Sequence, residues 1–171
     1  MMNNKLIRNF TAQATQLYSS ATLKVLARIL SKTSQNNAQV QEQLADFNNG
    51  AKILFKINYL KNAFVVFQVR DKHLYLIHER EQALIDYDLA IVIKHPALAF
   101  KILSLQEGNT IAVANNRFST NGDASLAINF INCLEIVEAH LLPRFISRRI
   151  LSKHDDISIN QKINFLKRII M

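Results

Sequence analysis

The sequence has few of the residues that crosslink, bend or loosen a chain. Its 171 residues include three glycines, two prolines, one cysteine and no tryptophan. The single cysteine, Cys133, excludes a disulfide within the chain and is typical of a reducing compartment. With so little glycine and proline, the composition indicates no flexible linker or low-complexity tail.

Long apolar runs are missing too. The first eight residues lack the roughly 7–15-residue apolar core of a secretion signal. The longest apolar runs, such as residues 89–93, have the length of a strand and fall short of the roughly 20 residues that a membrane-spanning helix needs. We therefore expect a soluble cytoplasmic protein, long enough for one domain with a sizeable core.

Positive charge is in excess and is concentrated at the two ends of the sequence. The net charge is +8, of which residues 1–32 carry +5 and residues 144–171 carry +5, whereas the middle carries −2. This asymmetry favours an anionic partner: a membrane surface, a nucleic acid or an acidic protein. A basic surface without a partner is the alternative.

Helical spacing dominates the first part of the sequence. Apolar residues recur every three or four positions over residues 6–18 and 22–30, which predicts a helix. Residues 31–37 are polar and predict a break, and residues 38–47 predict a second helix. Asn48-Asn49-Gly50 then marks a turn.

Strand patterns follow this turn. Residues 52–58, 63–70, 73–79 and 89–93 have the β-branched and aromatic content of strands, and Asp71-Lys72 predicts a two-residue hairpin turn. The second and fourth strands are apolar at nearly every position, which indicates cover on both faces or a lined cavity. The alternation directs inward Ile53, Phe55, Ile57, Val65, Phe67, Val69, Leu89, Ile91 and Ile93.

The pattern becomes helical again at Pro96, which fits the first turn of a helix because its missing N–H costs nothing there. Residues 97–105 continue this short helix. Residues 110–116 fit neither a helix nor a strand clearly.

A fifth strand and two further helices complete the pattern. Residues 117–121 predict the strand, and Asp123 is placed to cap a helix over residues 124–137. Residues 158–171 predict a basic amphipathic helix. The side chains of the fifth strand that should point inward are Phe118 and Thr120.

Together these elements predict an α+β domain. We expect a five-stranded, mainly antiparallel sheet covered by helices, with additional helices at both ends of the chain. Within this one structural domain, residues 1–48 would form N-terminal helices, residues 49–140 the core, and residues 141–171 the basic amphipathic C-terminal helices.

The sequence contains no catalytic constellation. A glycine-rich phosphate loop and a nucleophile elbow are both missing. In a strand, His73 and His78 would lie on opposite faces, so they would not share a metal ion. Asp86 and Asp88 fit a solvated loop, and Cys133 fits an apolar helix face. We therefore expect a protein that is not an enzyme and needs no metal or cofactor.

Nucleic-acid binding is a weaker interpretation of the basic charge. Proteins that bind single strands combine basic residues with exposed aromatic side chains. Here the aromatic residues of the strands alternate with aliphatic neighbours, as core residues do. No aromatic RNA-binding motif is present either.

The order of the elements resembles the sterol carrier protein type 2 family over about residues 50–137. The resemblance depends on the block of strand 89–94, short helix 96–104, the strand and turn Arg117-Phe118-Ser119-Thr120-Asn121-Gly122-Asp123, and helix 124–137. The extra terminal helices and Leu142-Pro143-Arg144-Phe145 are similar to the bacterial accessory lipid-binding factors of ubiquinone biosynthesis. Residues 110–116 depart from the family pattern.

The resemblance implies a non-catalytic carrier that presents an apolar molecule, such as a polyprenylated ubiquinone precursor, to enzymes of ubiquinone biosynthesis. The carrier would be cytoplasmic or peripheral at the inner membrane. A protein–protein interaction module without a lipid ligand is the main alternative, and a nucleic-acid-binding domain is the second. The hypothesis assigns to the lining of a lipid tunnel Phe55, Val65, Phe67, Ile91, Phe100, Leu103, Phe118, Leu126, Phe130 and Leu134.

The basic amphipathic pattern of residues 158–171 suggests contact with an anionic membrane surface. Packing of this helix on the domain is the alternative. The residues predicted to contact the membrane are Lys162, Phe165, Lys167 and Arg168.

Overall fold

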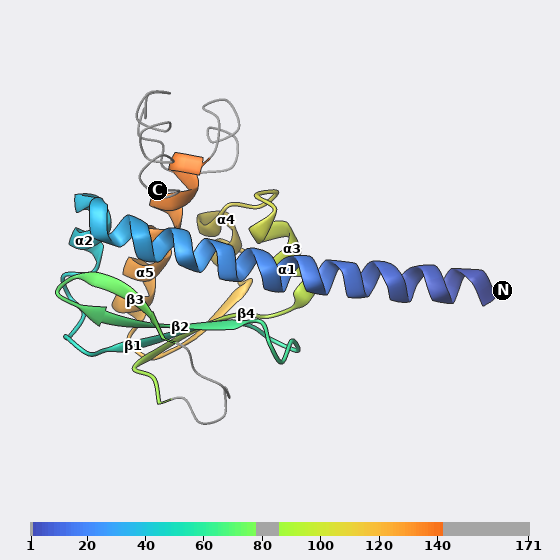
Figure 1. Cartoon of the computed structure of the whole chain (residues 1–171), viewed down its shortest axis with the longest axis horizontal. Helices are drawn as coiled ribbons and strands as arrows, with labels where there is room; N and C mark the ends of the chain where they lie inside the picture. Colours follow the sequence, from blue (N-terminus) through green and yellow to red (C-terminus); the bar gives the residue numbers. More distant parts are fainter. Residues whose placement is uncertain (1, 78–85, 142–171) are drawn as a thin grey trace.

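The computed structural model describes residues 2–77 and 86–141, with side chains from residue 13 onward. A sheet forms one layer and helices form a second layer on one of its faces (Figure 1). The predicted C-terminal helices and the end of the third predicted strand lie outside the described residues. The helices are α1 (Met2–Asn36), α2 (Ala38–Gln43), α3 (Pro96–Leu103), α4 (Asn109–Ala114) and α5 (Ala124–Leu141).

The sheet has five strands in the order β3-β2-β1-β4-β5. Neighbouring strands are antiparallel except for β1 and β4, which are parallel, so the predicted mainly antiparallel sheet is confirmed. In the register, Phe55 of β1 lies between Val65 of β2 and Ile91 of β4. The strands are β1 (Lys52–Ile57), β2 (Phe64–Arg70), β3 (His73–Ile77), β4 (Leu89–Ile93) and β5 (Phe118–Asn121).

Two of the turns predicted from the sequence contain residues with positive φ. Asp71 and Lys72 form the two-residue hairpin turn between β2 and β3, with φ of 49° and 63°, as a primed turn requires. Gly122 has φ of 122°, and a Cβ there would lie 2.5 Å from the carbonyl oxygen of Asp88. Only glycine fits this approach of the β5–α5 turn to the start of β4.

The predicted helix starts are confirmed by their caps. The Asn37 side chain accepts hydrogen bonds from the backbone N–H groups of Gln39 and Val40 and begins α2. Pro96 begins α3. Asp123 Oδ1 accepts hydrogen bonds from the backbone of Ser125 at 2.7 Å and of Leu126 at 3.2 Å, which fixes the start of α5.

The predicted break at residues 31–37 is wrong, because α1 continues through it to Asn36. Ser31, Thr33 and Ser34 are buried in the last turns of this helix, and their hydroxyls all donate to backbone carbonyl groups. Polar side chains usually favour breaks because they compete for backbone hydrogen bonds. Here the tertiary contact with β3 gives two of these hydroxyls partners outside the helix.

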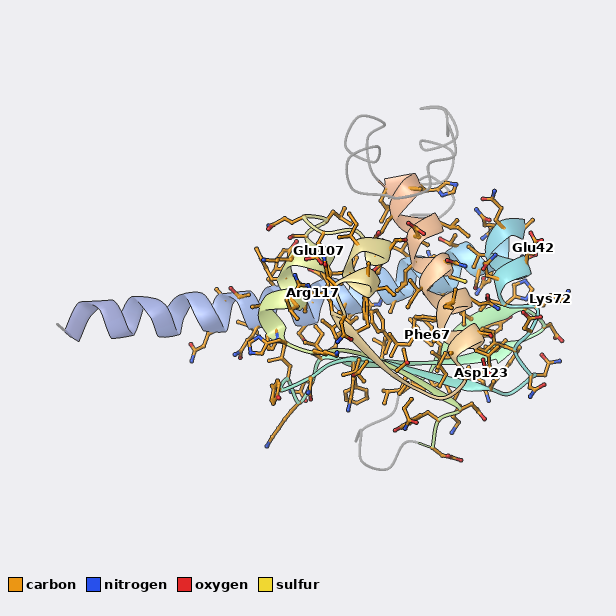
Figure 2. All side chains as sticks on the ribbon, turned by 180° about the vertical axis from the view of Figure 1, so that it is seen from behind. Glu42, Phe67, Lys72, Glu107, Arg117 and Asp123 are labelled. Carbon is orange, nitrogen blue, oxygen red and sulfur yellow. The ribbon has the colours of Figure 1, made fainter. Side chains whose placement is uncertain are left out.

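Residues 110–116, for which the sequence favoured no element, largely form α4. Glu107, which precedes this segment, is joined to its C-terminal end: its Oε1 accepts from Arg117 Nε at 3.1 Å and from Asn115 Nδ2 at 3.2 Å. Figure 2 shows Glu107 and Arg117 close together beside α4. Two side-chain contacts from Glu107 therefore close this loop around a helix too short to persist by propensity.

The main core lies between the sheet and the helices, and a smaller cluster of Leu54, Val66 and Ala90 is buried on the other face. The strands therefore bury side chains on both faces, although the described helices cover only one of them. Thr120 lies opposite Ile91 in the register, on the predicted face, but its side chain is exposed, because β5 is an edge strand with one neighbour among the described strands. Phe118, the other residue directed inward on this strand, is buried.

Helix α1 differs from the others in that its N-terminal half projects beyond the rest of the fold (Figure 1). Its later turns contact α3, β2 and β3. Leu17 and Val25, on the described part of the helix, are 73% and 53% exposed. This helix therefore presents apolar side chains to solvent in a region whose charge is entirely positive.

Candidate ligand-binding site

The side chains predicted to line a lipid tunnel come from six elements, and the structure brings nine of the ten into the main core. Val65 and Leu126 are half-buried at its border. Whether these side chains contact a ligand stays a prediction. The buried members are Phe55, Phe67, Ile91, Leu103, Phe118, Phe130 and Leu134.

Three aromatic rings fill the centre of this layer. The ring of Phe130 on α5 lies 5.9 Å from that of Phe55 and 5.6 Å from that of Phe67, measured between centroids. Figure 2 shows Phe67 between the sheet and α5. These are ordinary contact distances for aromatic pairs. A ligand chain can enter here only if α5 moves away from the sheet or the rings rotate.

Phe100, the tenth predicted lining residue, lies outside this cluster. Its ring packs against Tyr18 of α1 at 5.3 Å between centroids, in the contact between α1 and α3. Tyr18 is 44% exposed. Phe100 therefore lies near the surface, at the base of the projecting part of α1.

A polar cluster lies where α4 meets α5. The hydroxyl of Thr110 donates to Glu135 Oε1 at 2.6 Å and ties the first turn of α4 to α5. Beside it, Asn109 and Glu138 are 1% and 2% exposed. Asn109 Nδ2 and Glu138 Oε2 have no hydrogen-bond partner. Unpaired buried polar atoms are rare in folded proteins, so this pair requires an explanation.

Burial sets the protonation state of Glu138. Removal from water raises its pKa to about 8. The backbone N–H of Asn109 opposes this shift in part, the nearby carboxylate of Glu135 raises the pKa further, and the Asn109 side chain lowers it slightly. A carboxyl with such a pKa is mostly protonated at neutral pH. It can therefore donate one hydrogen bond and accept others.

The sequence contained a signal for this residue that the sequence-based prediction missed. Leu126, Phe130 and Leu134 recur every four residues along α5, and Glu138 occupies the next position of the same stripe. A charged residue at a position where helical periodicity expects an apolar one is an inconsistency between local pattern and burial. Such a position is a candidate for function.

Cys133 and Asp88, the residue types here that could take part in catalysis, have contacts that indicate a structural role instead. Burial raises the pKa of the Cys133 thiol to about 12, so it is not a reactive thiolate. Asp88 Oδ2 accepts a hydrogen bond from the backbone of Lys52 at 2.8 Å, which joins the starts of β1 and β4. Within residues 2–77 and 86–141, no group of three His, Cys, Asp or Glu side chains could hold a metal ion.

The residues predicted to contact a membrane, Lys162, Phe165, Lys167 and Arg168, lie outside the described residues. One described helix, α5, is long and apolar enough by composition to cross a membrane. Its apolar stripe is buried against the sheet and α2, as in the core helix of a globular domain.

Comparison with known sequences gives no match to a family model or to a curated protein. The structure is similar to a UbiJ-SCP2 ubiquinone synthesis protein, at 12% identity and a TM-score of 0.44, over 71% of this chain and 92% of that chain. It is similar to sterol carrier protein domain 2 of Helicoverpa armigera, at 14% identity and a TM-score of 0.44, over 77% of this chain and 93% of that one. A sterol carrier protein-2 like-3 from Aedes aegypti has 13% identity and a TM-score of 0.33, over 58% of this chain and 93% of that one. These proteins include sterol carrier domains, the family that the order of elements in the sequence resembles.

Proposed function

We propose that this protein is a non-catalytic carrier of an apolar molecule, accessory to ubiquinone biosynthesis. The observation that carries the proposal is the convergence of side chains from β1, β2, β4, β5, α3 and α5 on one apolar layer. These elements follow one another in the order that resembles the sterol carrier family. Removal of an isoprenoid chain from water would drive binding, at about 25 cal/mol per Å² of apolar surface.

The ligand would occupy the space between the sheet and α5. Since the rings of Phe55, Phe67 and Phe130 are in contact, binding would separate them and replace ring–ring contacts by ring–ligand contacts. A carrier must also release its cargo, and a closed layer in the empty protein limits the exposure of apolar surface to water between cycles.

The test is the binding of a neutral fluorescent apolar probe, N-phenyl-1-naphthylamine, and its displacement by ubiquinone with a short isoprenoid chain. The variant Phe130→Trp enlarges the side chain at the centre of the layer and should weaken probe binding at least tenfold. Ile128→Trp is the matched control, because Ile128 lies on the same helix but is 58% exposed. It should bind as the wild type does.

Two results would contradict the proposal. Either no binding of the probe or of any isoprenoid to the folded protein, or equal loss of binding in both variants, would favour an interaction module without a lipid ligand. Circular dichroism of each variant confirms that it is folded. If Phe130→Trp does not fold, Leu134→Phe probes the same layer.

We propose further that the basic ends hold the carrier at an anionic membrane surface. The exposed Leu17 and Val25 on the projecting helix, together with a sequence free of acidic residues up to position 32, support this role. Flotation with phosphatidylglycerol vesicles should be reduced by Leu17→Gln with Val25→Gln. Reversal of Lys162, Lys167 and Arg168 to Glu tests the other end, and unchanged flotation of both variants would exclude the membrane role.

A further inference from the structure

The unpaired polar atoms at the junction of α4 and α5 are the least explained feature of the described structure. Asn109 begins α4 and Glu138 lies in the last turn of α5, and both are almost completely buried. Asn109 lies close enough to act on the Glu138 carboxyl, yet neither Asn109 Nδ2 nor Glu138 Oε2 has a hydrogen bond of ordinary geometry. A buried polar atom without a partner opposes folding, so a partner from outside the chain would stabilise it.

The hydrogen-bonding capacity of the two side chains defines the chemistry of that partner. Asn109 Nδ2 can only donate, so the partner must accept. Glu138 can donate when protonated and accept in either state, and burial raises its pKa to about 8. A hydroxyl group fulfils both requirements, because one oxygen accepts from Asn109 and donates to, or accepts from, Glu138.

The same groups discriminate against an anionic partner. Glu135 accepts a hydrogen bond from Thr110 next to the pair, so a carboxylate or phosphate would meet one or two acidic side chains and no basic one among the groups that act on Glu138. Repulsion of this kind in a buried site is strong. A neutral hydroxyl is not repelled by these side chains.

The position of the pair connects it to the apolar layer. Glu138 follows Leu134 by four residues on α5, and Phe130 precedes Leu134 by four more. Val137 beside Glu138, and Ala112 one turn after Asn109, both belong to the main core. A molecule with its hydroxyl at the pair could therefore extend its apolar part along α5 toward the sheet.

We propose that Asn109 and Glu138 form a head-group site for the neutral hydroxyl of an otherwise apolar ligand, such as a phenol with a long hydrocarbon chain. This inference rests on the proposed carrier function and names the class of ligand. Helix α4 has six residues and is tied to α5 by the Thr110–Glu135 hydrogen bond, so its movement would give a ligand access to the pair.

The test compares two ligands that differ by the hydroxyl alone, 4-dodecylphenol and dodecylbenzene, in displacement of N-phenyl-1-naphthylamine at pH 7. The wild type should bind the phenol about tenfold more tightly, since a site built for a hydroxyl leaves its polar groups unpaired with the analogue that lacks it. Dodecanoate should bind more weakly than the phenol.

Four variants distinguish recognition of the hydroxyl from a general effect on the folded structure. Asn109→Leu and Glu138→Leu should remove the tenfold preference and leave the affinity for dodecylbenzene unchanged. Glu138→Gln keeps a donor and an acceptor and should retain the preference. Asn129→Leu, which removes a side-chain hydrogen bond of α5 to Asp46 at an exposed position, is the control and should retain it as well.

Each outcome decides between the alternatives. If neither ligand binds, the carrier function and the head-group site are both overturned. If both ligands bind with equal affinity, or if the leucine variants keep the preference, the carrier function survives but the head-group site does not. In the latter case, a structural water molecule is the expected partner of the pair.

Discussion

Besides Ser19, whose buried hydroxyl also has no partner, the buried polar side chains of the described residues lie in two places, one where α1 meets β3 and one where α4 meets α5. At the first, Ser31 Oγ donates to the carbonyl of Leu74 at 2.7 Å, and Ser34 Oγ accepts from the N–H of the same residue at 2.9 Å. At the second, Asn109 and Glu138 are equally buried but leave Nδ2 and Oε2 unpaired.

The difference separates a structural role from a candidate functional one. Strand β3 lies at the edge of the sheet, where backbone groups without a neighbouring strand invite pairing with other chains. The hydroxyls of α1 satisfy those groups at Leu74, so every polar atom named at this contact has a partner. At the α4–α5 pair, Asn109 Nδ2 and Glu138 Oε2 have no partner in the described structure, which suits side chains that bind a ligand.

The largest effect is expected at Glu138, on the pH dependence of the free energy of unfolding. A carboxyl whose pKa is raised in the folded state binds its proton more tightly there than in the unfolded chain. Its contribution to stability is therefore fully present below pH 4.5 and is lost as the pH rises to about 8. Glu138→Gln cannot ionise, and its free energy of unfolding at pH 8 should exceed that of the wild type by about 3 kcal/mol.

Urea unfolding at pH 5 and pH 8 measures this effect. The difference between variant and wild type should be small at pH 5 and large at pH 8, whereas Glu42→Gln, at an exposed position on α2, should follow the wild type at both. A constant difference between the two pH values would show that the carboxyl is solvated or already paired.

The next largest effect is expected where α1 meets β3 and the buried hydroxyls have partners. Ser34→Ala leaves the N–H of Leu74 without a partner in a buried place and should lower the free energy of unfolding by about 2 kcal/mol. Ser20→Ala is a matched control on the same helix, because its hydroxyl donates to Asn62 at an exposed position and at 3.3 Å. Equal effects of the two changes, measured by urea unfolding, would remove the contrast between the two regions.

The smallest prediction concerns the other member of the unpaired set. Asn109→Leu replaces an unpaired amide by an apolar group of similar size and should raise the free energy of unfolding by about 1 kcal/mol. Asn115→Leu, at the end of the same helix, removes a hydrogen bond to Glu107 and should give no increase. A clear loss of stability in Asn109→Leu would mean that Nδ2 has a partner in solution, and the two regions would then be alike.

Prediction from the sequence succeeded where a short segment determines its own conformation. Asp123 caps α5 through hydrogen bonds within three residues of itself, and Pro96 begins α3 because its ring fixes φ. Period-two alternation placed Phe55, Phe67 and Ile91 on the buried face of the sheet. Each of these features depends on neighbours in the sequence, so no knowledge of the fold was needed.

Prediction from the sequence failed where contacts with a distant segment change the conformation or the burial that a short segment would have by itself. Ser31 and Ser34 would favour a break in isolation, but β3 supplies them with partners more than 35 residues away in the sequence, and α1 continues. Thr120 lies two residues after the buried Phe118 and on the same face, yet it is exposed because no described strand pairs with β5 on its outer side. The candidate head-group site was missed for the same reason, since Asn109 and Glu138 are 29 residues apart and only the packing of α4 on α5 joins them.

The sequence by itself therefore determined the elements, the buried faces and the α+β class, because periodicity, capping and turn chemistry act over a few residues. Only the tertiary structure decided that β1 and β4 pair in parallel, that α1 runs unbroken along the edge strand, and that two unpaired polar side chains meet beside the apolar layer. The physical reason is that hydrogen-bond satisfaction and burial are properties of the whole packed chain. A residue's partners are fixed only when distant segments come together.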